Sequence, residues 1–180
     1  MAQRKILKMG DPQLNMISSE IIDILSEETQ CIIDDMRETM IVAKGAGIAA
    51  PQIGVLSRII LYGFEANPRY PDVAPIPERL LINPEIEILD EETVEGWEGC
   101  LSVPGLRGKV PRFKKIRVSA QDQSGSKIII VAEDFHARVI QHEFDHLEGV
   151  LYPQRITDLT QFGFIEELEK RGVIPKLADS

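Results

Sequence analysis

Residues 141–149 read Gln-His-Glu-Phe-Asp-His-Leu-Glu-Gly, and this stretch carries the strongest structural and functional signal in the chain. Apolar residues at mixed three- and four-residue steps in and before it predict a helix that ends at Gly149. On such a helix His142 and His146 lie one turn apart on the same face and can bind one metal ion. Glu143 then lies beside the metal without binding it, where a carboxylate can handle the protons of an activated water molecule.

A catalytic metal site needs a third protein ligand, and the chain offers few candidates because it has only three histidines and two cysteines. His136 precedes His142 by six residues, about 240° around the helix, so we expect it to face away. Cys31 lies in an apolar run on a predicted helix, where a small buried thiol is the usual interpretation. Cys100 lies in a tight, glycine-containing turn that can hold a thiolate still. We favour Cys100, with a carboxylate as the alternative.

Composition and charge narrow the class of protein. A chain of 180 residues can form one domain with a real core, and we expect a single catalytic domain over residues 1–180. No apolar run approaches the length of a membrane span, the N-terminus does not resemble a signal peptide, and two distant cysteines do not make a disulfide framework. These features predict a cytoplasmic protein with no membrane partner. The net charge of −9 argues against a general surface for binding nucleic acid.

A second notable stretch is the glycine-rich run at residues 45–52, which follows a helix predicted over residues 18–44 with Ser26 as a plausible N-cap. The run lacks the third glycine of a dinucleotide fingerprint and does not follow a strand. Two interpretations remain. The run is either a helix end with tight backbone packing, or a strip of exposed backbone along which a ligand lies, with Gln52 as a hydrogen-bond donor.

Strands are predicted between the glycine-rich run and the metal-binding helix. They cover residues 58–62, 79–83, 85–89, 112–118 and 127–131, and the last two are joined by a turn at residues 123–125. Alternation of basic and apolar residues over 112–118 indicates a strand with one face in water. The four prolines of residues 68–77 predict a loop.

A last amphipathic helix is predicted over residues 158–172, with Leu159, Phe162, Ile165 and Leu168 facing inward. The order of elements indicates an α+β fold in which mostly antiparallel β-sheets pack around a central metal-binding α-helix. One further helix lies in the N-terminal half of the chain and one at its C-terminal end.

Three motifs stand in order along the chain: Gly-x-Gly-aliphatic-Ala-Ala-x-Gln at residues 45–52, Glu-Gly-Cys-Leu-Ser at 98–102 and Gln-His-Glu-x-Asp-His at 141–146. Together they resemble the peptide deformylase family, and the resemblance covers nearly the whole chain. It implies hydrolytic removal of the formyl group from the N-terminal formyl-methionine of newly synthesised polypeptides, with release of formate.

The resemblance also implies the roles of individual residues. One divalent metal ion, ferrous iron in the cell and replaceable by zinc, nickel or cobalt, would be held by Cys100, His142 and His146. Glu143 would be the general base and acid, and the Gln52 side chain with the backbone N–H of Leu101 would form the oxyanion hole. The residues expected near the bound peptide are Gly45, Ala46, Gly47, Gly99 and Arg107.

Some positions depart from the family pattern or take lesser roles. His136 and Arg138 stand where the family often has apolar residues near the methionine pocket, so the lining of that pocket is expected to differ. Asp145 is assigned at most a role in orienting a metal ligand. Basic residues near the C-terminus are outnumbered by acidic ones, so we do not expect the ribosome contact that some family members make through a basic helix.

Two rival functions follow from the same residues. His-Glu-x-x-His is also the signature of zinc endopeptidases, and Gly149 even matches the metzincin pattern. That pattern breaks at Tyr152, where the third histidine should stand, and it leaves Cys100 and Gln52 without a role. The other rival is a metal-stabilised binding module, in which a fourth side chain would complete the metal's coordination.

Overall fold

The computed structural model describes residues 2–66 and 73–176, and within these ranges the chain forms one antiparallel sheet around a buried helix. The strands are β1 (Gly47–Ala49), β2 (Ile59–Phe64), β3 (Ile76–Cys100), β4 (Val103–Gln121), β5 (Lys127–Glu133) and β6 (Phe162–Phe164). The helices are α1 (Glu27–Val42), α2 (Asp134–Leu147) and α3 (Ile165–Lys170), with short 3-10 turns at Pro12–Asn15, Ala50–Ile53, Tyr152–Arg155 and Leu159–Gln161. The predicted α+β class is confirmed.

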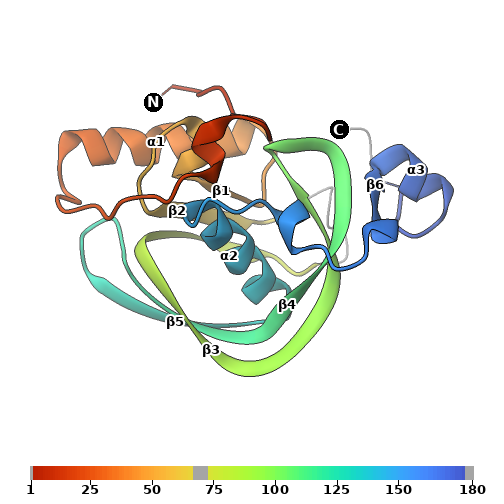
Figure 1. Cartoon of the computed structure of the whole chain (residues 1–180). Helices are drawn as coiled ribbons and strands as arrows, with labels where there is room; N and C mark the ends of the chain where they lie inside the picture. Colours follow the sequence, from red (N-terminus) through yellow and green to blue (C-terminus); the bar gives the residue numbers. More distant parts are fainter. Residues whose placement is uncertain (1, 67–72, 177–180) are drawn as a thin grey trace.

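The sheet order is β1-β2-β3-β4-β5, and β6 pairs with β4. β3 and β4 form a long hairpin whose pairing register shifts at several points, including between Ile82 and Glu85 and between Ile88 and Asp90. Such irregularities bend a ribbon and increase its twist. Figure 1 shows the β3–β4 ribbon curving around α2. The strands predicted separately at residues 79–83 and 85–89 are therefore parts of one continuous element.

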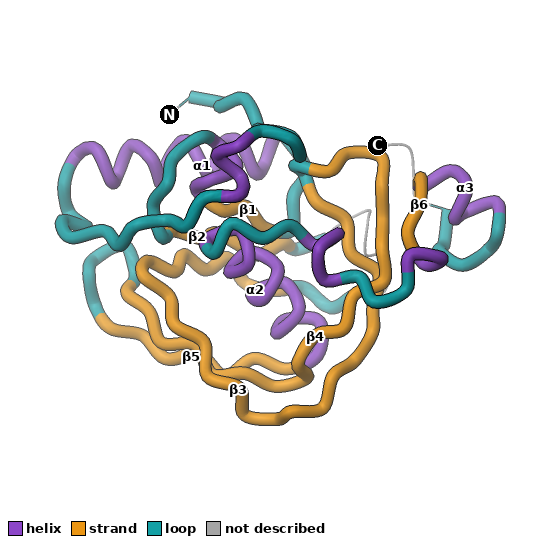
Figure 2. Tube along the Cα trace, in the orientation of Figure 1, coloured by secondary structure: helices purple, strands orange, loops and turns teal. Residues whose placement is uncertain are grey.

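β2 is buried on both faces, which explains its unbroken apolar sequence. Because successive side chains of a strand point to opposite faces, Ile60 and Tyr62 pack toward α2 while Ile59 and Leu61 pack toward α1. Figure 2 shows the two helices on opposite sides of these strands. The sheet thus separates the two main core clusters, and α2 lies inside one of them.

The C-terminal end of α2 is fixed by backbone geometry. Gly149, just beyond the helix, has a φ of 69°, and a Cβ atom there would lie 2.6 Å from the backbone carbon of Asn15. A glycine is therefore required both for the left-handed turn and for the close approach of the N-terminal segment. The predicted end of the helix at this residue agrees with the structure.

The first helix is shorter than the prediction of residues 18–44. Ser26 is its N-cap, as expected, and its hydroxyl accepts a hydrogen bond from the Thr29 N–H at 3.2 Å. The preceding residues are irregular, with bends and a turn, and other elements bind part of their backbone, as when the Ser18 N–H donates to the Leu147 carbonyl at 2.8 Å. Cys31 is exposed, which corrects the expectation of a buried thiol; it lies two residues, and so about 200°, from the buried Ile33.

The predicted helix over residues 158–172 is wrong in its first half. Leu159–Gln161 is a short 3-10 turn, Phe162–Phe164 is a strand that pairs with Leu106–Gly108 of β4, and only Ile165–Lys170 is α-helical. Leu159 is 71% exposed rather than inward-facing. Pairing with β4 overrides the helical periodicity of the sequence. Of the predicted proline-rich loop at 68–77, residues 67–72 lie outside the described part of the chain, and β3 already begins at Ile76.

Candidate metal centre

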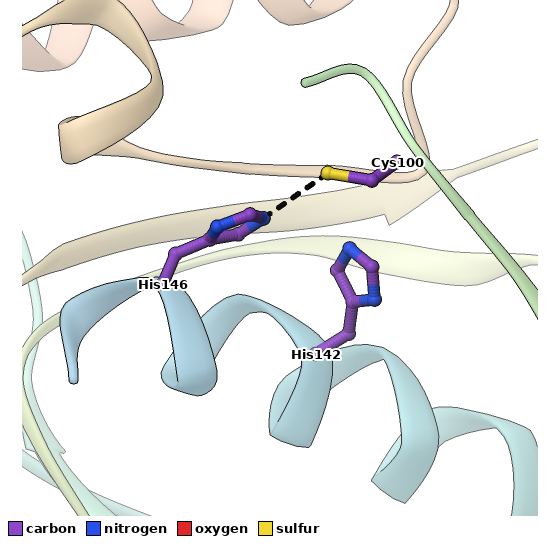
Figure 3. A group of neighbouring side chains, drawn as sticks. All are labelled: Cys100, His142 and His146. Atoms are coloured by element: carbon purple, nitrogen blue, oxygen red, sulfur yellow. Dashed lines mark hydrogen bonds between the residues drawn. The ribbon is translucent and has the colours of Figure 1, made fainter. Parts of the chain in front are cut away.

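Cys100, His142 and His146 come together at the centre of the molecule. Each offers one ligand atom, and these atoms all lie within 4.8 Å of one another. Figure 3 shows the two imidazoles projecting from successive turns of α2 toward the Cys100 sulfur at the end of β3. The sulfur and the Nε2 atom of His146 are 3.3 Å apart, and all three side chains are buried.

This donor set fits a divalent transition metal. Typical metal–sulfur and metal–nitrogen distances in a tetrahedral site place the two donors about 3.6 Å apart, close to the separation seen here. The Gln52 side-chain amide and the Ser102 backbone N–H both donate toward the Cys100 sulfur at 3.4 Å, which fixes the position of this sulfur. A thiolate with two imidazoles suits zinc or ferrous iron better than calcium or magnesium.

Glu98 orients His142. The Nδ1 atom of His142 lies 2.8 Å from a Glu98 carboxylate oxygen, which leaves Nε2 as the nitrogen available to a metal. Two arginines bind the same carboxylate: Arg112 with two hydrogen bonds of 2.9 and 3.0 Å, and Arg138 with one of 2.8 Å. Burial alone would raise the pKa of Glu98, but the His142 hydrogen bond and the Arg112 charge outweigh it and hold the pKa well below its usual range.

Asp145 extends the network of charged side chains that lies behind the cluster of Cys100, His142 and His146. It accepts hydrogen bonds from Arg112 at 2.6 Å and from Arg155 at 2.8 and 3.2 Å. Asp145 is therefore linked to His142 through Arg112 and Glu98.

Arg112 is buried, so the expectation that the basic residues of 112–118 all face water is wrong at this position. Sequence reasoning missed Glu98, although it stands inside one of the three motifs.

Glu143 lies next to the ligand cluster with its carboxylate against Gly47. A Cβ atom at residue 47 would lie 2.4 Å from the Glu143 Oε1 atom, so this packing requires a glycine. The Oε2 atom of Glu143 is buried without a hydrogen-bond partner. Burial raises the pKa of this carboxyl group to about 7. A group with that pKa can both accept and return a proton near neutral pH.

A cavity opens onto this centre, and most of the predicted site residues line it. Its wall is formed by Ala46, Gly47, Gln52, Glu98, Gly99, Cys100, Leu101, Phe135, Arg138, Val139, His142 and Glu143. Gln52 is itself fixed: its carbonyl oxygen accepts from the Ala49 N–H at 2.8 Å, and its amide donates to the Ser102 hydroxyl at 3.1 Å.

Several predicted residues lie apart from this wall. Gly45 borders a neighbouring, larger hollow beside α1, and Arg107 is buried on β4, where its side chain runs along Gly99. His136 lies away from the ligand cluster, and its Nε2 atom is 3.0 Å from the Tyr62 hydroxyl. Tyr152 stacks on His142 with ring centres 6.0 Å apart. Tyr152, which stands where a metzincin has its third histidine, therefore packs against His142.

A helix bearing His-Glu-x-x-His, joined by a thiol from the end of a strand, defines the class: a metal-dependent hydrolase. Comparison with known proteins narrows this class. The family model for polypeptide deformylase matches residues 3–162. Peptide deformylase 2 of Ralstonia nicotianae is 52% identical over 165 residues, covering 92% of this chain and 93% of that protein. Peptide deformylase 1 of Bordetella pertussis is 55% identical over 163 residues, covering 91% and 93%.

Solved structures agree with these sequence relatives. The class I type b peptide deformylase of Acinetobacter baumannii with Met-Ala-Ser bound has a TM-score of 0.82 at 36% identity, covering 86% of this chain and 99% of that one. A peptide deformylase of Synechococcus elongatus in complex with actinonin has a TM-score of 0.78 at 34% identity, covering 96% and 91%. The chain belongs to the peptide deformylase family and is an enzyme of the hydrolase class. None of the described helices is long and apolar enough to cross a membrane.

Proposed function

We propose that this enzyme removes the formyl group from the N-terminal formyl-methionine of newly synthesised polypeptides and releases formate. The observation that supports this most strongly is the clustering of Cys100, His142 and His146 beside a cavity that Gln52 and Glu143 also line. The Acinetobacter relative was solved with Met-Ala-Ser, a peptide that begins with methionine, and this supports the same substrate class here.

We further propose that Cys100, His142 and His146 hold one divalent metal ion, ferrous iron in the cell, which zinc, nickel or cobalt can replace. A metal bound there supplies Lewis acidity: it lowers the pKa of a water molecule from 15.7 toward about 7 and polarises the formyl carbonyl group. Burial lowers the pKa of His146, which favours the neutral imidazole that a metal ligand requires.

Glu143 moves the protons in this proposal. Its carboxylate takes a proton from the attacking water and returns it to the amine nitrogen as the bond between that nitrogen and the formyl carbon breaks. The pKa of about 7 suits both directions of transfer, and the unpartnered Oε2 atom is available for the task. Such positioned proton transfer contributes roughly 10²–10⁴ in rate.

The negative charge that develops on the formyl oxygen is stabilised by the side-chain amide of Gln52 and the backbone N–H of Leu101. The hydrogen bonds that fix Gln52 before substrate arrives support this role, because a preorganised donor does not have to reorient during the reaction.

The peptide lies along the backbone of Gly45, Ala46 and Gly47 and beside Gly99. β1 is the outermost strand of the sheet, so its outer edge can pair with an extended peptide. Arg107 supports Gly99 from behind, because it packs beneath this residue rather than lining the cavity.

A direct test compares two substrates with purified, metal-loaded enzyme. We expect formate release from formyl-Met-Ala-Ser and no cleavage of an internal peptide bond in an N-acetylated peptide. Cleavage of the internal bond with the formyl group left intact would contradict the proposal. That result would favour the zinc endopeptidase, a function that none of the comparisons supports.

A further inference from the structure

Arg138 is a charged side chain buried in the wall of the cavity, and the chemistry proposed above gives it no role. It lies on α2, one turn before His142, with only 9% of its side chain exposed. A buried guanidinium group is costly unless its donors are satisfied, so its partners indicate what it is for.

The guanidinium group joins α2 to both strands of the long hairpin. Nη1 donates to the Glu98 carboxylate at 2.8 Å, to the Val110 carbonyl at 2.8 Å and to the Gly96 carbonyl at 3.3 Å. Nη2 donates to the Val94 carbonyl at 2.5 Å. Arg138 thus connects the helix that carries two metal ligands with the strand that ends at the third.

The guanidinium group packs directly against the backbone of Gly96. A Cβ atom at this residue would lie 2.8 Å from the Arg138 Cζ atom and 2.9 Å from its Nε and Nη2 atoms. Any side chain at position 96 would therefore force the guanidinium group out of its place. Gly96 and Arg138 form a matched pair in which the missing side chain of one makes room for the other.

Arg138 also neutralises Glu98. The carboxylate of Glu98 is bonded by two guanidinium groups, Arg112 and Arg138, while Asp145 is bonded by Arg112 and by the half-exposed Arg155. Without Arg138, the carboxylate of Glu98 would lose one of its two cationic partners while it still orients His142, and breaking a buried ion pair by removing one partner is strongly unfavourable.

We propose that Arg138, packed against Gly96, is a positioning residue for the metal centre. It holds Glu98 against His142 and sets the spacing between α2 and the end of β3 that carries Cys100. The inference rests on the proposed function only in requiring that this cluster bind a metal ion.

The test measures cobalt binding by competition with a chromophoric chelator, together with the thiolate-to-cobalt absorption band. Arg138→Met should weaken cobalt binding by about 10–100-fold and shift that band, the range typical for partners that orient metal ligands. Gly96→Ala should act in the same direction. In the double variant the alanine should add nothing, because the group it displaces is gone.

Arg58→Gln is the matched control. Arg58 also pairs with a carboxylate at the end of α2, bonding Glu148 at 2.7 Å with 15% of its side chain exposed, and its other partners are the Pro84 carbonyl and the Phe144 ring. Cobalt affinity should be unchanged in this variant, whatever it does to stability.

Wild-type cobalt affinity in folded Arg138→Met, or additive effects in the double variant, would overturn the inference. If Arg138→Met does not fold, Gly96→Ala alone decides: an unchanged affinity and spectrum refute the proposal. Formate release is measured separately. Protein that shows the predicted cobalt effects but never releases formate refutes the proposed function and leaves the role of Arg138 standing.

Discussion

Gly47 shows how one absent side chain determines the place of a reactive group. The Glu143 carboxylate rests on its backbone, where a Cβ atom would come within 2.4 Å of Oε1. The sequence motif predicts that both residues belong to the site. It does not predict their contact, because 96 positions of chain separate them and only the packing of α2 against β1 brings them together.

Gly47→Ala should lower kcat by about 10²-fold, because displacement of a catalytic group by around 1 Å is enough for such a loss. Steady-state kinetics with a formyl-methionine peptide measures this, with metal content determined in parallel. Gly163→Ala is the control, since a Cβ atom there meets Leu168 only at ordinary contact distances of 3.7 and 3.8 Å. Equal kcat in the two variants would contradict the assigned position of Glu143.

Glu143→Ala should keep its fold and bound metal while kcat falls by about 10²–10⁴-fold, because in the proposed mechanism the carboxylate handles protons and is not a ligand. Metal analysis and kinetics on the same preparation separate the two roles. Turnover close to that of the unmodified enzyme would remove Glu143 from the mechanism.

Among the elements, the easiest to predict are those whose local sequence already shows which residues are buried. β2 is apolar throughout because both of its faces are covered, and α1 has its N-cap at Ser26. The C-terminal segment was mispredicted because Phe162–Phe164 satisfies a helical pattern and yet pairs with β4. Local sequence does not reveal a pairing between strands far apart in the chain, and it does not reveal the register shifts that curve β3.

The N-terminal segment is bound to α1 through Asp35, and this contact should depend on pH. The Asp35 carboxylate accepts from the Arg4 side chain at 2.8 Å and from the Ala2 N–H at 2.7 Å. The Arg4 hydrogen bond, aided by that of Ala2, holds the pKa of Asp35 below its ordinary value of 3.8. A lowered carboxyl pKa stabilises the folded state above the unfolded pKa, and this contribution is lost as pH falls through the folded pKa.

Asp35→Asn should therefore lower the free energy of unfolding at pH 7 by about 1 kcal/mol, a modest figure because Arg4 is half exposed. The difference from the unmodified protein should shrink as pH falls below 3.8. Urea unfolding at a series of pH values measures it. Asp34→Asn, which removes a more exposed pair with Arg37, should cost less; an equal loss in both variants would contradict this account.

At the scale of the whole molecule, the curved hairpin and α2 together form the proposed metal centre. The strand end supplies a thiol, and the helix supplies two imidazoles and a carboxylate. The three motifs predicted these groups correctly as neighbours. They did not predict the buried cluster of Glu98, Arg112, Asp145 and Arg138, because a charged residue in a sequence usually indicates a surface, and its burial depends on partners elsewhere in the chain.

The most direct test is X-ray absorption at the metal edge, on protein prepared without oxygen, for the unmodified chain, Cys100→Ser and Cys31→Ser. We predict one metal ion per chain with a sulfur neighbour at about 2.3 Å and nitrogen neighbours at about 2.0–2.1 Å. Cys100→Ser should lose the sulfur signal and most of the metal, while Cys31→Ser keeps both. Equal metal content and an unchanged sulfur signal in the two variants would contradict the proposed metal centre.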